Sequence, residues 1–225
     1  MTRRFLILTA IFLAAQFSAR ADDLTQSSIV DNNVAYLRVG DVGTNLPEEI
    51  QSAQSAPATN IIAGTILDLR FAGGDDLDSA RAAEKLLAQT NLPLAILVND
   101  ETSGAAIELA KDLRAAKAGL IFGDSTEVEP DIPVSVSAAN EKIFMKNPYG
   151  MISTNENDSA SVTNDFLPFV DHTTEADLVQ AKAKDGDENF TPPPAGPQKP
   201  FIRDPVLARG VDFIRGLAAL HLSHS

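Results

Sequence analysis

The sequence predicts an α/β fold built on a parallel sheet. Three runs, 61–69, 94–98 and 120–122, are almost continuously apolar, as strands buried on both faces are. The two intervals between these runs repeat apolar residues at helical spacing. Strand, helix, strand, helix and strand in this rhythm imply parallel strands joined by right-handed crossovers.

The first 21 residues have the three parts of a cleavable secretory signal. Arg3 and Arg4 come first, an apolar run over 5–15 follows, and Ala19-Arg20-Ala21 forms a small-x-small cleavage site. The run is short for a membrane-spanning helix, so an uncleaved anchor is the weaker alternative. We therefore expect export to a periplasm or the cell exterior, with no membrane anchor after cleavage of residues 1–21.

The main core is expected over residues 34–190, preceded by a loose polar segment over 22–33. Residues 34–39 alternate like a strand, and a helix is expected from Pro47 to Ser55. Asp75 or Asp76 is placed to cap the helix after the first buried run. Thr102 or Ser103 is placed to cap the helix after the second run.

The pattern is weaker in the second half of the core, over 135–190. Residues 132–136 and 142–145 are candidate short strands, and 174–184 is a candidate charged helix. A Pro-rich linker over 191–203 is expected to be extended. A last helix over 204–221 has Asp204 as its N-cap and Pro205 at its first position, and its apolar stripe should pack on the core.

The charge and the missing cysteines exclude several functions. The chain has 31 acidic and 18 basic residues, so it has no attraction for nucleic acid or anionic lipid. The leader contains three of the basic residues, Arg3, Arg4 and Arg20, and no acid, which leaves 15 basic against 31 acidic residues and a net charge of −16. Without cysteine there is no thiol nucleophile, disulfide or cysteine-bound metal.

Neither a metal nor an organic cofactor is expected. Asp75, Asp76 and Asp78 with Asp68 lack the spacing of an EF-hand loop, and acids in a first helical turn are ordinary. The three histidines are isolated, with no H-E-x-x-H pair for zinc. Gly73-Gly74 lacks the residues of a phosphate-binding loop.

A set of motifs in order carries the functional information. A strand, Ile66-Leu67-Asp68-Leu69-Arg70, enters a Gly73-Gly74 turn, a second strand ends at Val98-Asn99, and a third ends at Gly123. This set resembles the core of the tail-specific, or C-terminal-processing, serine peptidases, over about residues 34–129. The resemblance implies a ClpP/crotonase-like fold without the PDZ insert of that family, and a protein that self-associates.

The resemblance also places the catalytic residues, and both are replaced. The family uses a Ser–Lys dyad, in which a neutral lysine takes the proton of the nucleophilic serine. When Asn99 is aligned with the family asparagine, the nucleophile position is Gly104 and the base position is Glu129. Gly104 has no side chain to attack with, so the resemblance predicts a catalytically inactive homologue.

Two features leave some chemistry open. Ser103 is an alternative nucleophile, although its simpler role is to cap a helix. By the resemblance, the oxyanion hole would use the backbone N–H groups of Gly73 or Gly74 and of Ala105. Backbone donors survive the loss of side chains, so a peptide carbonyl or carboxylate could still bind there.

Three functions follow as hypotheses. The first is an exported, inactive tail-specific-protease-like protein that binds a peptide or protein partner. The second is an active serine endopeptidase with a displaced nucleophile at Ser103. The third is a structural exported protein without a ligand. The first and second differ in where the Ser103 hydroxyl points and in what lies within hydrogen-bond reach of it.

Overall fold

The computed structural model describes residues 22–56, 61–150 and 202–220. The expected signal peptide over 1–21, the candidate helix over 174–184 and most of the expected Pro-rich linker lie outside these residues. A six-stranded sheet has the order β1-β2-β4-β6-β7-β8, and a two-stranded sheet joins β3 to β5. The strands are β1 Leu24–Val30, β2 Val34–Val39, β3 Asp41–Val42, β4 Gly64–Asp68, β5 Gly73–Gly74, β6 Leu94–Asn99, β7 Gly119–Asp124 and β8 Ile132–Pro133.

The sheet is parallel except for β1, as the apolar runs predicted. Residues Tyr36, Ile66, Ala95 and Leu120 lie side by side across β2, β4, β6 and β7. Five helices accompany the strands in the described ranges: α1 Leu46–Ser55, α2 Leu77–Ala88, α3 Ala105–Ala115, α4 Ala138–Lys146 and α6 Pro205–Ala219. The α/β class is therefore confirmed. None of the described helices is long and apolar enough to span a bilayer.

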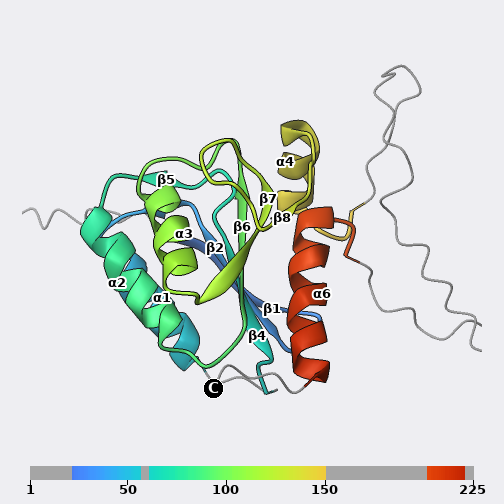
Figure 1. Cartoon of the computed structure of the whole chain (residues 1–225), viewed down its shortest axis with the longest axis horizontal. Helices are drawn as coiled ribbons and strands as arrows, with labels where there is room; N and C mark the ends of the chain where they lie inside the picture. The colour runs from blue at the N-terminus through green and yellow to red at the C-terminus, as the bar shows by residue number, and fades with distance from the viewer. Residues whose placement is uncertain (1–21, 57–60, 151–201, 221–225) are drawn as a thin grey trace, which may run out of the picture.

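Helices cover both faces of the sheet (Figure 1). On one face α1, α2 and α3 pack against alternate strand residues such as Leu67, Ile96 and Ile121. On the other face α6 packs against Ile66, Leu97 and their neighbours. Since successive residues of a strand point to opposite faces, this double cover explains why the sequence of the central strands is continuously apolar.

The expectation of a loose segment over 22–33 is wrong for Leu24–Val30. These residues form β1, which runs antiparallel to β2 through a turn in which Asp31 and Asn32 have positive φ. The mostly polar residues of this segment predict a loop. An edge strand tolerates polar residues, because it has fewer neighbours and is less buried than a central strand is.

Two other expectations for the second half of the core are corrected. Residues 142–145 lie in α4, whose N-cap Ser137 accepts a hydrogen bond from the Asn140 N–H. Of 132–136, Ile132–Pro133 forms β8 and pairs with β7, and the Val134 N–H donates to the Gly123 carbonyl of β7 at 2.8 Å. Pro133 has no N–H to donate, which limits further pairing along this strand.

The last helix, α6, begins where the sequence predicted, at Pro205 with Asp204 as its N-cap. The Asp204 carboxylate accepts hydrogen bonds from the N–H groups of Val206 and Leu207, and Pro205 occupies the first turn. Val206, Leu207, Val211 and Ile214 are buried against the sheet. The helix therefore docks on the core as its apolar stripe predicted.

Candidate functional site

The motif residues converge at the carboxyl edge of the sheet. The ends of β4 and β6 are paired through Asp68 and Leu97, so the segments that follow them emerge side by side. One segment contains the Gly73–Gly74 turn and the other contains Ser103, Gly104 and Ala105. The Ser103 N–H donates to the Ala72 carbonyl at 2.9 Å and joins the two segments directly.

Gly104, at the position that the resemblance assigns to the nucleophile, has a backbone conformation that favours glycine. Its φ is +57° and its ψ is −132°, a conformation that side chains rarely tolerate. A Cβ atom added there would lie 2.2 Å from the Gly74 carbonyl oxygen. The volume that a serine side chain would need is therefore already filled by a backbone oxygen.

The glycines expected to form the oxyanion hole, Gly73 and Gly74, lie next to Gly104. The Gly73 N–H already donates to the Gly40 carbonyl at 3.4 Å. Gly74 packs closely on β3, because a Cβ there would be 2.5 Å from both the Val42 nitrogen and the Val42 oxygen. The oxygen of Gly74 that faces Gly104 is an acceptor, and it would repel a developing oxyanion.

Ser103 does not cap its helix. Its side chain is exposed, and helix α3 begins after Gly104 without a side-chain cap. A Cβ added to Gly73 would lie 3.5 Å from both the Ser103 Oγ and the Asp41 Oδ1, so these two side chains converge over the turn. Within the described ranges, no Lys or His hydrogen-bonds to the Ser103 hydroxyl.

Glu129, at the position that the resemblance assigns to the base, contacts Arg114 near the C-terminal end of α3, whereas Gly104 precedes the N-terminus of that helix. It is exposed after β7, and its backbone carbonyl accepts a hydrogen bond from the Arg114 Nη2. No hydrogen bond or ion pair in the described part of the chain joins its side chain to Ser103 or Gly104. The structure thus brings Gly73, Gly74, Ser103, Gly104 and Ala105 together, without Glu129.

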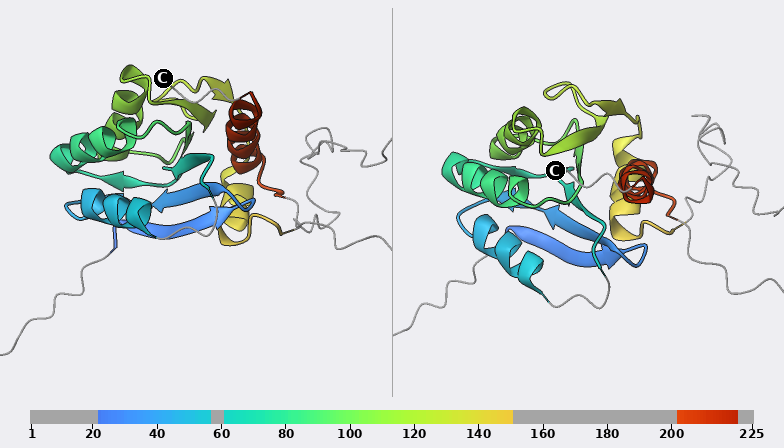
Figure 2. Two further views of the ribbon diagram at one scale, coloured as in Figure 1. Left: turned by 90° about the horizontal axis from the view of Figure 1, so that it is seen from below. Right: turned by 60° about the horizontal axis from the view of Figure 1, so that its bottom comes forward.

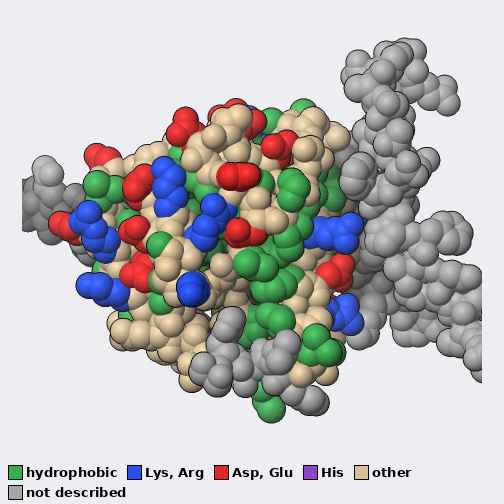
Figure 3. Space-filling view, viewed as in Figure 1, with side chains coloured by type: hydrophobic (Ala, Val, Ile, Leu, Met, Phe, Trp, Pro, Cys, Tyr) green, Lys and Arg blue, Asp and Glu red, His purple; other side chains and the backbone are tan. Residues whose placement is uncertain are grey.

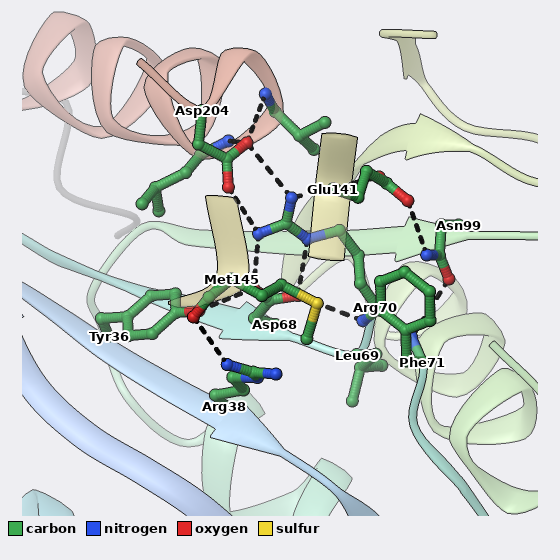
Figure 4. A network of polar contacts seen from close by, with 12 residues as sticks. Tyr36, Arg38, Asp68, Leu69, Arg70, Phe71, Asn99, Glu141, Met145 and Asp204 are labelled. Carbon is green, nitrogen blue, oxygen red and sulfur yellow. Dashed lines mark hydrogen bonds and ion pairs between the residues drawn. The ribbon is translucent and has the colours of Figure 1, made fainter. Parts of the chain in front are cut away.

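A buried polar network lies behind this surface, and sequence reasoning missed it (Figure 4). Arg70 donates to both oxygens of Asp68, at 2.9 and 2.7 Å, and to both oxygens of Asp204, at 3.1 and 2.8 Å. All three side chains are at most 1% exposed. Two bidentate pairs on one guanidinium tie the end of β4 to the start of α6.

Asn99 connects this network to the surface turn. Its Nδ2 donates to Glu141 of α4 at 2.7 Å, and its Oδ1 accepts from the Phe71 N–H at 3.1 Å. The Thr102 hydroxyl accepts from the Asn99 N–H at 3.0 Å and donates to the Leu69 carbonyl at 2.9 Å. The expected capping residue Thr102 therefore fixes the loop that leads to Ser103.

The network contains more negative than positive charge. Glu141 lies 4.0 Å from the Arg70 Nη1, whose stronger contacts go to the two aspartates. Burial raises the pKa of Glu141, and the hydrogen bond from Asn99 and the charge of Arg70 offset this only in part. Burial alone would raise the pKa of Asp68 too, but the adjacent Arg70 and the hydrogen bonds from Arg70 and Tyr36 hold it below its usual value.

Two other groups respond to the same charges. Burial, followed by the negative charge of Asp68, raises the pKa of Tyr36, whose hydroxyl donates to Asp68 at 2.7 Å. The two aspartates raise the pKa of Arg70 in spite of its burial. Tyr36 and Arg70 therefore keep their protons and hold the Asp68 carboxylate in place.

One part of the network was open to prediction from the sequence. Asp68 and Arg70 are two positions apart, so side chains in extended backbone share a face. Asp204 was expected as a helix cap, but nothing local indicates that it meets Arg70, 134 positions earlier. No group of three or more His, Asp or Glu residues arranged to hold a metal occurs in the described ranges.

Acidic side chains are frequent around the turn, next to a lysine, Lys142, whose Nζ lies 5.2 Å from the centre of the Phe71 ring. Asp41, Asp75, Glu101 and Asp124 are all exposed near strand ends or the loops that follow them. Figure 3 shows acidic side chains over the upper part of the same view as Figure 1, above α3. A cationic molecule would be attracted to this side of the protein, and an anionic one repelled.

The comparisons with known proteins give partial likenesses. No family model and no curated protein matches the sequence. The solved structures that align include the photosystem II D1 C-terminal processing protease, with a TM-score of 0.39 and 19% identity over 45% of this chain. The chain covers 42% of that protease, less than half of its length.

Two bacterial structures align to a similar extent. A lipoprotein from Streptococcus agalactiae has a TM-score of 0.38 and 10% identity, covering 54% of this chain and 68% of its own. A candidate peptidase from Parabacteroides merdae has a TM-score of 0.38 and 12% identity, covering 52% of this chain and 59% of its own. Scores and coverage of this size do not assign a family.

Proposed function

We propose that this chain is an exported, catalytically inactive protein with a tail-specific-peptidase-like core of the ClpP/crotonase kind. It binds an extended peptide, or a peptide segment of a protein, at the carboxyl edge of the sheet. The binding surface comprises Gly73, Gly74, Ser103 and Gly104, and Ala105, expected from the sequence to take part, is buried behind them.

The geometry of Gly104 carries this proposal. The family chemistry needs a nucleophile that projects from this position toward backbone donors. Here the position has a glycine backbone, and the Gly74 oxygen occupies the space of the side chain. The exposed polar backbone and the Ser103 hydroxyl beside it support binding without covalent chemistry.

The acidic surroundings favour peptides that contain lysine or arginine. Asp41 lies directly over the Gly73 turn, and Asp75 and Glu101 are exposed in the adjoining loops. The attraction between opposite charges raises the rate at which a basic peptide meets this surface, and salt weakens that attraction. We expect a basic extended peptide to bind more tightly than an acidic peptide of equal length.

Fluorescence anisotropy with labelled basic and acidic peptides tests the binding. Gly73→Leu should weaken binding, because its added side chain meets only ordinary contacts at Cβ and then covers the turn. Gly216→Leu is the matched control, since a Cβ there meets nothing within 4 Å on α6. Binding that is unaffected by Gly73→Leu would place the peptide elsewhere.

A second function, peptidase activity from a displaced nucleophile, is favoured by one observation. The Ser103 hydroxyl is exposed, points toward the Gly73 turn and does not cap α3. An assay on an unstructured protein substrate separates the two functions. We expect no cleavage by the chain or by Ser103→Ala, and cleavage that disappears in Ser103→Ala would establish the second function instead.

A further inference from the structure

The two edges of the main sheet are built differently. At one edge, β8 is only two residues long, contains Pro133 and pairs with Phe122 and Gly123 of β7. Beside it the Asp131 carboxylate accepts the Ile121 N–H at 2.8 Å and lies 3.6 Å from the Arg114 Nε. Short strands, proline and charged side chains are the features by which proteins prevent an edge from pairing with another chain.

The other edge, β1, has none of these features except a bulge at its start. Its seven residues, Leu-Thr-Gln-Ser-Ser-Ile-Val, include no charge and no proline, and the register shift lies between Leu24 and Gln26. In the described part of the chain, β1 pairs only with β2 (Figure 2). Gln26 and Ser27 are both exposed, and Ile29 is 45% exposed.

The carboxylates that flank β1 are already engaged. The Asp23 Oδ2 accepts the Asn45 N–H at 2.9 Å, and Glu49 accepts the Leu24 N–H at 2.6 Å. At the other end of the strand, Asp31 forms an ion pair with Arg215 at 3.2 Å. A chain approaching this edge therefore meets uncharged side chains between partnered acids.

We propose that β1 is a self-association surface, at which two copies of this chain pair their β1 strands antiparallel about a two-fold axis. The chain has a net charge of −13, so two copies repel each other over most of their surfaces. An uncharged strand is self-complementary, and pairing would satisfy its outward backbone groups and cover Ile29. The result is one continuous sheet across the dimer.

Two identical dipeptides in the chain provide a matched test. Gln26-Ser27 lies on β1 and Gln51-Ser52 lies on α1, and all four residues are exposed. Gln26→Lys/Ser27→Lys places like charges at the proposed seam, while Gln51→Lys/Ser52→Lys makes the same change in charge on a helix. Both variants are made in the chain from Asp22 onward, and circular dichroism checks that they fold alike.

Sedimentation equilibrium measures the assembly. We expect a dimer for the unmodified chain and for the α1 variant, and a dissociation constant raised by about tenfold or more for the β1 variant. A monomer at all concentrations, or a dimer that the β1 variant leaves intact, would refute the proposal. Hydrogen exchange in a monomer would then show whether another segment of the chain protects the β1 amides instead.

Discussion

The buried network around Arg70 and the surface turn at Gly73–Gly74 lie next to each other but differ in kind. The network contains the groups that could do acid–base chemistry, and each is fixed by partners and shielded from solvent. The turn is accessible and offers backbone groups, Ser103 and a carboxylate. Reactive side chains and access are therefore separated in this protein, which favours binding over catalysis.

The largest expected effect is on the network. Arg70→Met fills a similar volume but leaves Asp68, Asp204 and Glu141 buried without a cation. Breaking a buried pair in this way costs about 3–5 kcal/mol. Urea denaturation should show this loss, or failure to fold.

The control for Arg70 is an ion pair on the surface. Arg81 lies 3.1 Å from Asp78 in an exposed pair on α2, and Arg81→Met should change stability by at most about 1 kcal/mol. Equal effects of the two substitutions would mean that the buried network is not the main electrostatic connection between α6 and the sheet.

The next effect concerns the turn. Gly104→Ser forces a side chain into a strained backbone and against the Gly74 oxygen, at a cost of about 1–3 kcal/mol or more. Because the side chain would displace that oxygen, we expect no peptidase activity in this variant. Thermal denaturation measures this loss of stability. Gly73→Ala is the control, and it should be nearly neutral because its added Cβ meets contacts of 3.5 Å.

A smaller effect should appear in the pH dependence of stability. The folded-state pKa of Glu141 is raised above the unfolded value, so the folded state binds its proton more tightly. The stabilisation is fully present below the unfolded pKa, near 4.5, and is lost as the pH rises through the folded pKa. Glu141→Gln keeps an oxygen to accept from Asn99, and should abolish this loss.

The measurement is the urea midpoint of both proteins across the mildly acidic to neutral range. Asp68 provides the opposite trend, because its pKa is lowered in the folded state. Its stabilising contribution is present above about pH 3.8 and is lost only as the pH falls below that value and the carboxylate is protonated. Parallel curves for the two proteins would show that Glu141 does not titrate in this interval.

The smallest effect is expected at Ser103. Its hydroxyl is exposed and caps nothing, so Ser103→Ala should change the unfolding free energy by less than about 0.5 kcal/mol. A larger loss would mean that the hydroxyl holds the turn in place. Ser103 would then be a side chain fixed by partners, like those of the buried network.

Much of the architecture could be predicted because it rests on local patterns. The continuous apolar runs gave the central strands, and Asp76 and Asp204 gave two helix starts that the structure confirms. The short elements were less predictable. α4 resembled a strand over 142–145, and the polar β1 resembled a loop, because each depends on what packs beside it.

The amino-acid sequence by itself determined the buried strands, the helix caps at Asp76 and Asp204, and the absence of a serine and a lysine at positions 104 and 129. The tertiary structure decided that Asp204 meets Arg70, that Glu141 meets Asn99, and that the Gly74 oxygen fills the space beside Gly104. Periodicity and capping act over a few residues and are visible in sequence. Burial of charge and the approach of two backbones depend on segments that only the folded chain brings together.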